Sequence, residues 1–331
     1  MEGGKLSGHA ISDLGRNARA VFLNNPGRHP LDSGGGSVAG RHRRYGEEET
    51  EAVLRDLQLV WISHIHADHH AGLPSVLVAR RKALQAAGNP SPPPLLVIGP
   101  WPLHGYLKAW NEIEDLCFMF ADCRESAVGG MEARAGRFAG NAVHGSGAVA
   151  MALSSMQGGD PQAKVALEQA QQALGLTRLT SVDVIHCAQS FALVLEHETG
   201  WKIVYSGDTR PCPKLAKAAK GATVLVHEAT FDDDMLEEAE AKKHSMTREA
   251  IEIGVEADVF RTILTHFSQR YPKIPVFNES YTDRTCIAFD LMTVNLADLE
   301  MLPSLLPAMK LLFKEENKEE KGVFEEEAEE N

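Results

Sequence analysis

The chain has 331 residues, of which 44% are hydrophobic and 24% are charged, a composition typical of an ordinary globular protein. No apolar run approaches the roughly 20 residues that a membrane span needs, and the first residues lack the apolar stretch of a secretory signal. The five cysteines form no CxxC pair, which argues against a disulfide framework or a thiolate zinc finger and favours a reducing, intracellular compartment.

The net charge of −13 opposes nucleic-acid binding in sum, but its distribution is uneven. Residues 315–331 contain nine Glu and two Lys, so the rest of the chain carries a net charge of only −6. Two bound dications would offset more negative charge locally. The acidity therefore weakens the case for an RNA substrate without deciding it.

The first 50 residues show only weak periodicity. After them, apolar runs bounded by Gly and Pro predict the elements of the first half of the chain. We expect a buried strand at 57–63, a helix at 71–87, a strand at 95–99, an irregular insertion at 124–160 and a helix at about 161–174.

The second half alternates more clearly between strand and helix patterns. We expect strands at 182–186, 191–197, 201–206, 222–227 and 261–265, and helices at 213–220, 233–242, 247–256 and 303–313. Thr247 is the expected N-cap of the third of these helices, with Glu249 in its first turn. Mixed strands and helices predict an α/β or α+β sandwich with its sheets inside.

The segment Ser63-His64-Ile65-His66-Ala67-Asp68-His69-His70 follows directly on the first predicted strand. Alternation along an extended chain places His64 and His66 on one side, and the following turn lets Asp68 and His69 face a neighbouring point. Imidazole and carboxylate groups are suitable zinc ligands, so this HxHxDH spacing predicts a metal site with two adjacent ions. A solvated histidine-rich loop is the less favoured interpretation.

Three further ligands are expected at strand ends: His186 after SVDVI, Asp208 after WKIVYSG, and His266 after RTILT. Alone, each would more often be a satisfied polar residue, but with the HxHxDH segment each becomes a ligand candidate. Asp208 suits a bridging position because a carboxylate has two oxygens. Two such ions polarise a phosphate oxygen and activate water. The remaining histidines lack a partner pattern and are expected to be core or surface residues: His9, His29, His42, His70, His104, His144 and His197.

Several segments resemble ribonuclease Z, the tRNA 3′-processing endoribonuclease, and specifically the C-terminal half of its long eukaryotic form. They are SHIHADHHAGLPS (63–75), IHCAQSFALVLEH (185–197), YSGDTRPCP (205–213), VHEATFDD (226–233), KHSMTREAI (243–251), LTHFSQRYPKIP (264–275), CIAFDLM (286–292) and LPSLLPAMKLLF (302–313). The resemblance implies a metallo-β-lactamase fold of the α+β class, a four-layer αββα sandwich. It also implies cleavage of the 3′ trailer from precursor tRNA, leaving a 3′-hydroxyl on the tRNA.

The resemblance implies two zinc ions per chain, with Mn²⁺ as a substitute. One would be held by His64, His66 and His186, the other by Asp68, His69 and His266, and Asp208 would bridge them. Asp68, Glu228 and His244 are the implied catalytic residues, His244 donating a proton to the leaving ribose oxygen under the orientation of Glu228; His227 is expected to be structural. Arg270 is similar to the family's phosphate-contacting arginine, and Ser190, Thr209 and Lys273 are weaker substrate-binding candidates.

These considerations divide the chain into three parts. Residues 1–50 are expected to be a degenerate or truncated N-terminal part of the sandwich, since the family's opening motifs appear altered at 7–17 and 31–36. Residues 51–313 would form the catalytic domain with an irregular insertion near 124–180, and 314–331 a disordered acidic tail. No tRNA-gripping arm is evident, so the partner besides precursor tRNA would be a second copy of the chain or a missing N-terminal half. Nucleus, mitochondrion and plastid are all open for this family.

Two alternatives remain at this point. The HxHxDH segment alone also fits a thioesterase-like hydrolase of the same fold. A non-catalytic fragment or partner subunit of a long-form ribonuclease Z would keep the motifs without the activity.

Overall fold

The computed structural model describes residues 21–22, 46–125, 161–268, 283–288 and 294–308. They divide into two compact units. The N-terminal unit contains the described residues up to 183 together with 187–200, and the C-terminal unit contains 184–186 and the described residues from 201 onward. Within these ranges no helix has both the length and the apolar character that crossing a bilayer requires.

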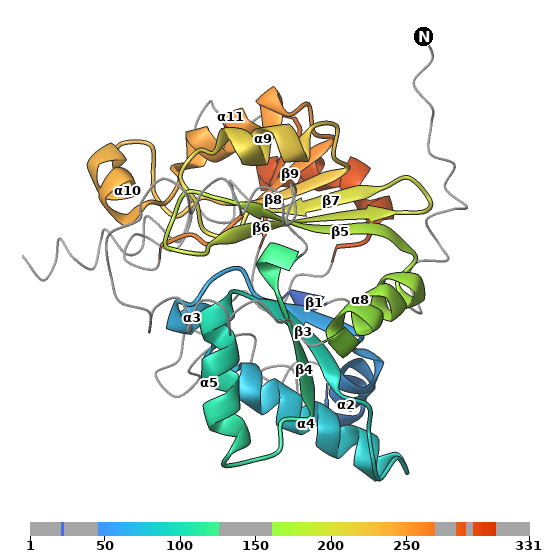
Figure 1. Ribbon diagram of the computed structural model, residues 1–331. Helices are drawn as coiled ribbons and strands as arrows, with labels where there is room; N and C mark the ends of the chain where they lie inside the picture. The colour runs from blue at the N-terminus through green and yellow to red at the C-terminus, as the bar shows by residue number, and fades with distance from the viewer. Residues whose placement is uncertain (1–20, 23–45, 126–160, 269–282, 289–293, 309–331) are drawn as a thin grey trace, which may run out of the picture. The chain divides into compact units, whose positions relative to one another are not determined.

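A parallel sheet forms the centre of the N-terminal unit (Figure 1). Its strands lie in the order β1 (Val21–Phe22), β2 (Leu59–Trp61), β3 (Leu95–Gly99) and β4 (Phe118–Asp122). Three helices pack on one face: α2 (Glu47–Asp56), α4 (Leu73–Ala86) and α5 (Trp101–Asn111). Alternation along the strands explains this packing, because Val60 and Val97 face the helices while Trp61 points away and donates its indole N–H to Ser181 Oγ at 3.1 Å.

The same unit contains helix α8 (Pro161–Ala173) and two antiparallel strands, β5 (Leu176–Asp183) and β6 (Phe191–His197). The expected strand at 191–197 is confirmed, and the helix expected at 161–174 ends one residue earlier. The strand expected at 182–186 is placed wrongly, since β5 begins at Leu176 and ends at Asp183. The ladder with β6 accounts for the difference: six residues of β5 before Asp183 find partners there, whereas Val184 to His186 lie beyond its end.

The C-terminal unit is built on a second parallel sheet, with β7 (Lys202–Tyr205), β8 (Val224–Glu228), β9 (Arg261–Thr265) and β10 (Thr285–Ile287) side by side in that order (Figure 1). Helix α11 (Thr247–Glu256) packs on one face through Ile251 and Leu264. The short turns η3 (Leu296–Glu300) and η4 (Leu302–Leu305) pack on the other face through Leu299, Leu302 and Ile263. Helices α9 (Pro213–Ala219) and α10 (Leu236–Lys242) also belong to this unit.

Parallel pairing brings the carboxyl ends of β7, β8 and β9 to one edge of this sheet. Tyr205 pairs with Val226, and Glu228 pairs with Thr265, so the segments that follow the three strands start at similar heights. The polar residues of those segments therefore meet at this edge, as ligand-binding residues do in other parallel sheets.

Two expectations for helix ends need correction. Helix α11 begins at Thr247 as predicted, but its N-cap position is Met246, and the Thr247 hydroxyl instead donates to Phe231 O at 3.4 Å. Glu249 lies in the first turn as expected and accepts a hydrogen bond from the Met246 N–H. The helix expected at 303–313 begins later than predicted: residues 302–305 form the turn η4, residues 306–308 are α-helical, and residues from 309 onward lie outside the described part.

Candidate metal centre

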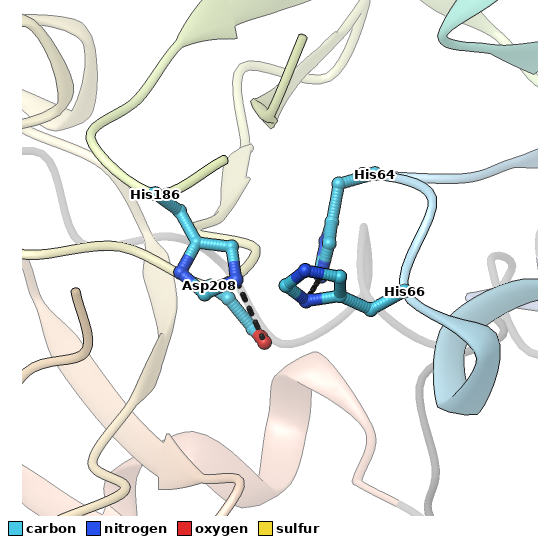
Figure 2. Close-up of side chains that lie close together, drawn as sticks. All are labelled: His64, His66, His186 and Asp208. Atoms are coloured by element: carbon cyan, nitrogen blue, oxygen red, sulfur yellow. Dashed lines mark hydrogen bonds and ion pairs between the residues drawn. The ribbon is translucent and has the colours of Figure 1, made fainter. Parts of the chain in front are cut away.

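In the N-terminal unit, the HxHxDH segment begins just beyond β2 and ends in the short helix α3 (Ala67–His70). His64 is fully buried; its Nδ1 lies 2.9 Å from Ser63 Oγ and its Nε2 lies 3.1 Å from His66 Nδ1. Figure 2 shows these two imidazoles with their nitrogens facing each other. His69 is also buried, and its ring centroid lies 4.1 Å from that of His64. Three imidazoles thus converge at one strand end.

Backbone contacts hold this segment in place. The amide of Ile62 donates to Ile98 O at 2.8 Å, and the carbonyl of Ser63 accepts from Phe191 N at 3.0 Å, so the residues before His64 are hydrogen-bonded on both sides. Asp68 is exposed, and its Oδ2 lies 3.4 Å from His69 Nε2. These backbone contacts position the strand end from which the HxHxDH segment starts.

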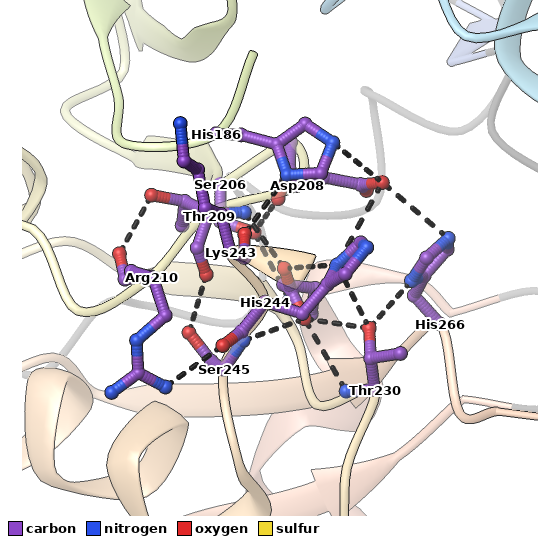
Figure 3. A network of polar contacts seen from close by, with 12 residues as sticks. His186, Ser206, Asp208, Thr209, Arg210, Thr230, Lys243, His244, Ser245 and His266 are labelled. Carbon is purple, nitrogen blue, oxygen red and sulfur yellow. Dashed lines mark hydrogen bonds and ion pairs between the residues drawn. The ribbon is translucent and has the colours of Figure 1, made fainter. Parts of the chain in front are cut away.

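In the C-terminal unit, the buried carboxylate of Asp208 is the point on which three imidazoles converge (Figure 3). Its Oδ2 lies 3.6 Å from His266 Nε2, 3.9 Å from His186 Nε2 and 3.9 Å from His244 Nδ1. Asp208, His244 and His266 offer ligand atoms that all lie within 4.8 Å of one another. Figure 2 shows His186 turned toward the same carboxylate. This donor set, imidazole with one carboxylate, fits a zinc-like dication.

The backbone and a hydroxyl fix the orientation of two of these imidazoles. His186 Nδ1 lies 2.8 Å from the carbonyl oxygen of Lys243, and His266 Nδ1 lies 2.8 Å from Thr230 Oγ1. A proton on Nδ1 in each case leaves Nε2 as the lone-pair nitrogen on the side of Asp208. Metal-binding histidines in proteins are commonly held by such a contact on the other ring nitrogen.

Glu228, at the end of β8, is a buried carboxylate whose two oxygens are fully used. Its Oε1 accepts from the Thr209 amide at 2.7 Å and lies 2.8 Å from His244 Nδ1. Its Oε2 accepts from the Thr230 hydroxyl at 2.6 Å and from the Ser245 amide at 3.1 Å. These charge-assisted hydrogen bonds explain how a carboxylate is accommodated in the interior. They also direct Nδ1 of His244 to Glu228 and leave its Nε2 for other partners.

Of the four predicted substrate-binding residues, two lie within the described part of the chain. Ser190 and Thr209 are buried, and their hydroxyls donate to the carbonyl oxygens of Cys187 and Arg210. Arg270 and Lys273 lie outside the described residues.

Four of the histidines that were expected to bind no metal lie in packed positions. His227 is fully buried with its Nδ1 2.7 Å from Glu228 O, and burial lowers its pKa. His104 stacks on Phe120, His197 is buried, and His70 lies against Tyr106. The others of this group lie outside the described residues: His9, His29, His42 and His144.

Sequence reasoning assigned no role in the site to three residues that contact it: Thr230, Arg210 and Glu249. Two of them lie close to a predicted residue along the chain, Thr230 two positions after Glu228 and Arg210 two after Asp208. Their polar type and this closeness were the available signal.

Comparisons with known proteins agree with the geometry. The chain is 43% identical to tRNase Z TRZ4, mitochondrial, of Arabidopsis thaliana, over 90% of this chain and 34% of the relative. It is 37% identical to zinc phosphodiesterase ELAC protein 2 of Homo sapiens, over 93% of this chain and again 34% of the relative. The chain is thus similar to tRNase Z proteins over at least 90% of its length. It spans about a third of the length of these curated tRNase Z relatives.

Solved structures of tRNase Z relatives also match. A long-form RNase Z from yeast has a TM-score of 0.68 and 25% identity, covering 84% of this chain and 38% of that one. The short form of human tRNase Z has a TM-score of 0.52 and 20% identity, covering 80% and 86% respectively. No family model matches the chain. The predicted α+β class and metallo-β-lactamase fold are confirmed, and so is the resemblance to ribonuclease Z.

Proposed function

We propose that the chain is the metal-binding catalytic part of a tRNase Z-type endoribonuclease, which removes the 3′ trailer from precursor tRNA and leaves a 3′-hydroxyl on the tRNA. One observation carries the proposal: Glu228 orients His244 beside the carboxylate of Asp208, on which His186 and His266 also converge. Metal-dependent phosphodiester hydrolysis uses metal ligands of this kind, and an adjacent proton donor assists the departure of the leaving oxygen. The identity to tRNase Z supports it and does not favour a thioesterase-like hydrolase.

The proposed ligand sets follow the resemblance: His64, His66 and His186 for one zinc ion, Asp68, His69 and His266 for a second, and Asp208 as the bridge. Mn²⁺ would serve as a substitute. When bound, such ions supply Lewis-acid polarisation of the scissile phosphate and activation of water. The clusters at the ends of β2 and of β7 to β9 provide the imidazole and carboxylate groups that zinc prefers.

The residues of the chain then have distinct tasks. His244 donates a proton to the leaving ribose oxygen from Nε2, because its Nδ1 is engaged with Glu228. The buried carboxylate stabilises the protonated imidazole and holds it in one orientation. Asp68 is proposed both as a ligand of the second zinc ion and as a catalytic residue, as the resemblance implies. Arg270 contacts the phosphate, and Ser190, Thr209 and Lys273 are weaker substrate contacts.

Precursor tRNA is the proposed substrate, and the mitochondrial designation of two relatives supports an intracellular site of action. A homodimer, or the association with a separate N-terminal half, would supply a grip on the tRNA body.

The test is to incubate the purified chain with an end-labelled precursor tRNA and zinc or manganese, and to map the products. We expect one cut next to the discriminator nucleotide, a 3′-hydroxyl on the tRNA, and loss of at least about 100-fold in kcat for His244→Ala, given the usual contribution of a general acid. The control substrates are bis(p-nitrophenyl) phosphate and a thioester. Turnover of the thioester alone, or no cut by folded, zinc-loaded protein, would overturn the proposal.

A further inference from the structure

The first three residues of the loop between α10 and α11, Lys243–Ser245, contact both a proposed metal ligand, His186, and Glu228, the partner of the proposed proton donor. The Lys243 carbonyl accepts from His186 Nδ1 at 2.8 Å. The Ser245 amide donates to Glu228 at 3.1 Å, and the Ser245 hydroxyl donates to Thr209 O at 2.6 Å. Lys243 has a φ of +58°, the left-handed conformation that ends α10 and turns this carbonyl toward His186. The backbone position of this loop therefore sets the geometry of two functional imidazoles.

Arg210 is the side chain that holds the loop. Its Nη1 donates to the His244 carbonyl at 2.8 Å, and its Nη1 and Nη2 each donate to one carboxylate oxygen of Glu249 at 2.6 Å. The two side chains are 17% and 14% exposed, so solvent screens this pair far less than a surface ion pair. Glu249 Oε2 also accepts from the Met246 amide at 2.9 Å, at the start of α11. Arg210 thus joins the segment after β7, which contains Asp208, to the segment before α11, which contains His244 (Figure 3).

The geometry of the guanidinium explains why this contact is specific. Its donors form a planar, rigid fork, so binding two carboxylate oxygens fixes the direction of the donor to the His244 carbonyl. Fixing that carbonyl fixes the peptide plane between His244 and Ser245 and hence the backbone from which the imidazole extends. A lysine offers only a point charge and cannot hold both partners in this way.

We propose that Arg210, clamped by Glu249, is a positioning residue that places His244 for proton donation and His186 for metal binding. The proposed effect on proton donation rests on the proposed function. The proposed effect on metal binding does not require that the chain cleaves RNA. Contacts of this kind around metal ligands are worth about 10–100-fold in metal affinity or activity.

The experiment compares Arg210→Met, Glu249→Gln and the double variant with wild type. Glutamine keeps an acceptor for the Met246 amide, so Glu249→Gln weakens the clamp without removing the start of α11. The matched control is Arg261→Met, which removes a half-buried guanidinium bonded to the Leu299 carbonyl at 2.6 Å. Arg261 lies at the start of β9, at the opposite end of the strand from His266. Zinc affinity is measured by chelator competition. The kinetic constants kcat and KM are measured with precursor tRNA as substrate, and folding is followed by thermal melting.

We expect Arg210→Met to lower zinc affinity about tenfold and kcat about 10–100-fold, with KM within about twofold of wild type. The double variant should be no worse than Arg210→Met, since both single changes break one clamp. Arg261→Met should lower the melting temperature and leave zinc affinity and kcat unchanged. If Arg210→Met lowers the melting temperature as Arg261→Met does, but leaves zinc affinity and kcat unchanged at equal folded fraction, the clamp is only structural and the inference fails. If wild type binds zinc but cuts no precursor tRNA, the proposed function fails, and the zinc data alone decide the metal-binding part.

Discussion

At the scale of single residues, the carboxylate of Glu228 links proposed proton donation with proposed metal binding in the C-terminal unit. One of its oxygens orients His244, and the other accepts from Thr230, whose hydroxyl oxygen also lies 2.8 Å from His266 Nδ1. The Thr230 hydroxyl can donate only one hydrogen, and it is directed to Glu228. It must then accept from His266, which sets the tautomer of that imidazole. A proposed proton donor and a proposed metal ligand thus depend on the same buried carboxylate.

Replacing Thr230 by valine tests this dependence, because valine has the same shape without the hydroxyl. We expect Thr230→Val to lower zinc affinity about tenfold, since His266 loses the acceptor that fixes its Nδ1–H. Thr230→Ser, which keeps the hydroxyl, is the matched control and should stay near wild type. The measurement is chelator competition at constant pH. Equal zinc affinity in the valine and serine variants would show that Thr230 does not orient His266.

At the scale of elements, the edge of the second sheet depends on how closely α11 packs on β9. Gly254 allows this contact: a Cβ at that position would lie 2.1 Å from Thr262 Oγ1, much closer than any real contact. Ile251 packs against the same strand through Leu264. Helix α11 begins directly after the loop that contains His244, so its seating on the sheet also determines where that loop lies.

Gly254→Ala should therefore destabilise the protein by about 1–3 kcal/mol, the usual cost of forcing extra volume into a packed interior. Gly105→Ala in α5 is the control, because a Cβ there meets nothing within 4 Å and alanine is the better helix former. That variant should be unchanged or more stable by about 0.5–1 kcal/mol. Urea unfolding monitored by circular dichroism measures both. Gly254→Ala as stable as Gly105→Ala would mean that α11 has room to shift.

At the scale of the whole molecule, each of the two units buries polar side chains that are proposed to bind metal. His64 and His69 are buried in the N-terminal unit, and Asp208 is buried in the C-terminal unit. Burying polar or charged groups is costly unless they are paired or bind a metal. Ions that bind only the folded state stabilise it by mass action, by about 4 kcal/mol at a free concentration roughly 1,000 times Kd.

Removal of the metal should consequently lower the melting temperature, by several degrees for a chain of this size. Thermal melts with and without a chelator, combined with a zinc count on the dialysed protein, measure this effect. We expect about two zinc ions per chain and recovery of the melting temperature when zinc is added back. The Asp208→Asn variant should show a smaller chelator response. A melting temperature that is the same with and without the chelator would exclude metal binding by these residues.

Much of the chain could be read locally. Strands β3, β6 and β9 lie where their apolar runs predict, because continuous apolar stretches of this length are typical of strands buried on both faces. The HxHxDH spacing, and the position of His186, Asp208 and His266 at strand ends, predicted the ligand candidates, since metal chemistry restricts residue type and spacing. Other elements had no such signal. Helix α5 contains Pro, Gly and two Trp, and β10 has only three residues, so neither presents a clear period.

Only the tertiary structure revealed the contacts that orient the site. Arg210 and Glu249 are 39 positions apart, and Thr230 and His266 are 36 apart, so no periodicity along the chain relates them. Their meeting results from the parallel pairing of β7, β8 and β9, which brings three strand ends to one edge. Residue types and local spacing were sufficient to predict which side chains are candidates to bind a metal, because ligand chemistry is a property of each side chain. Which nitrogen each imidazole presents is a property of its neighbours in space, and these are determined by the fold.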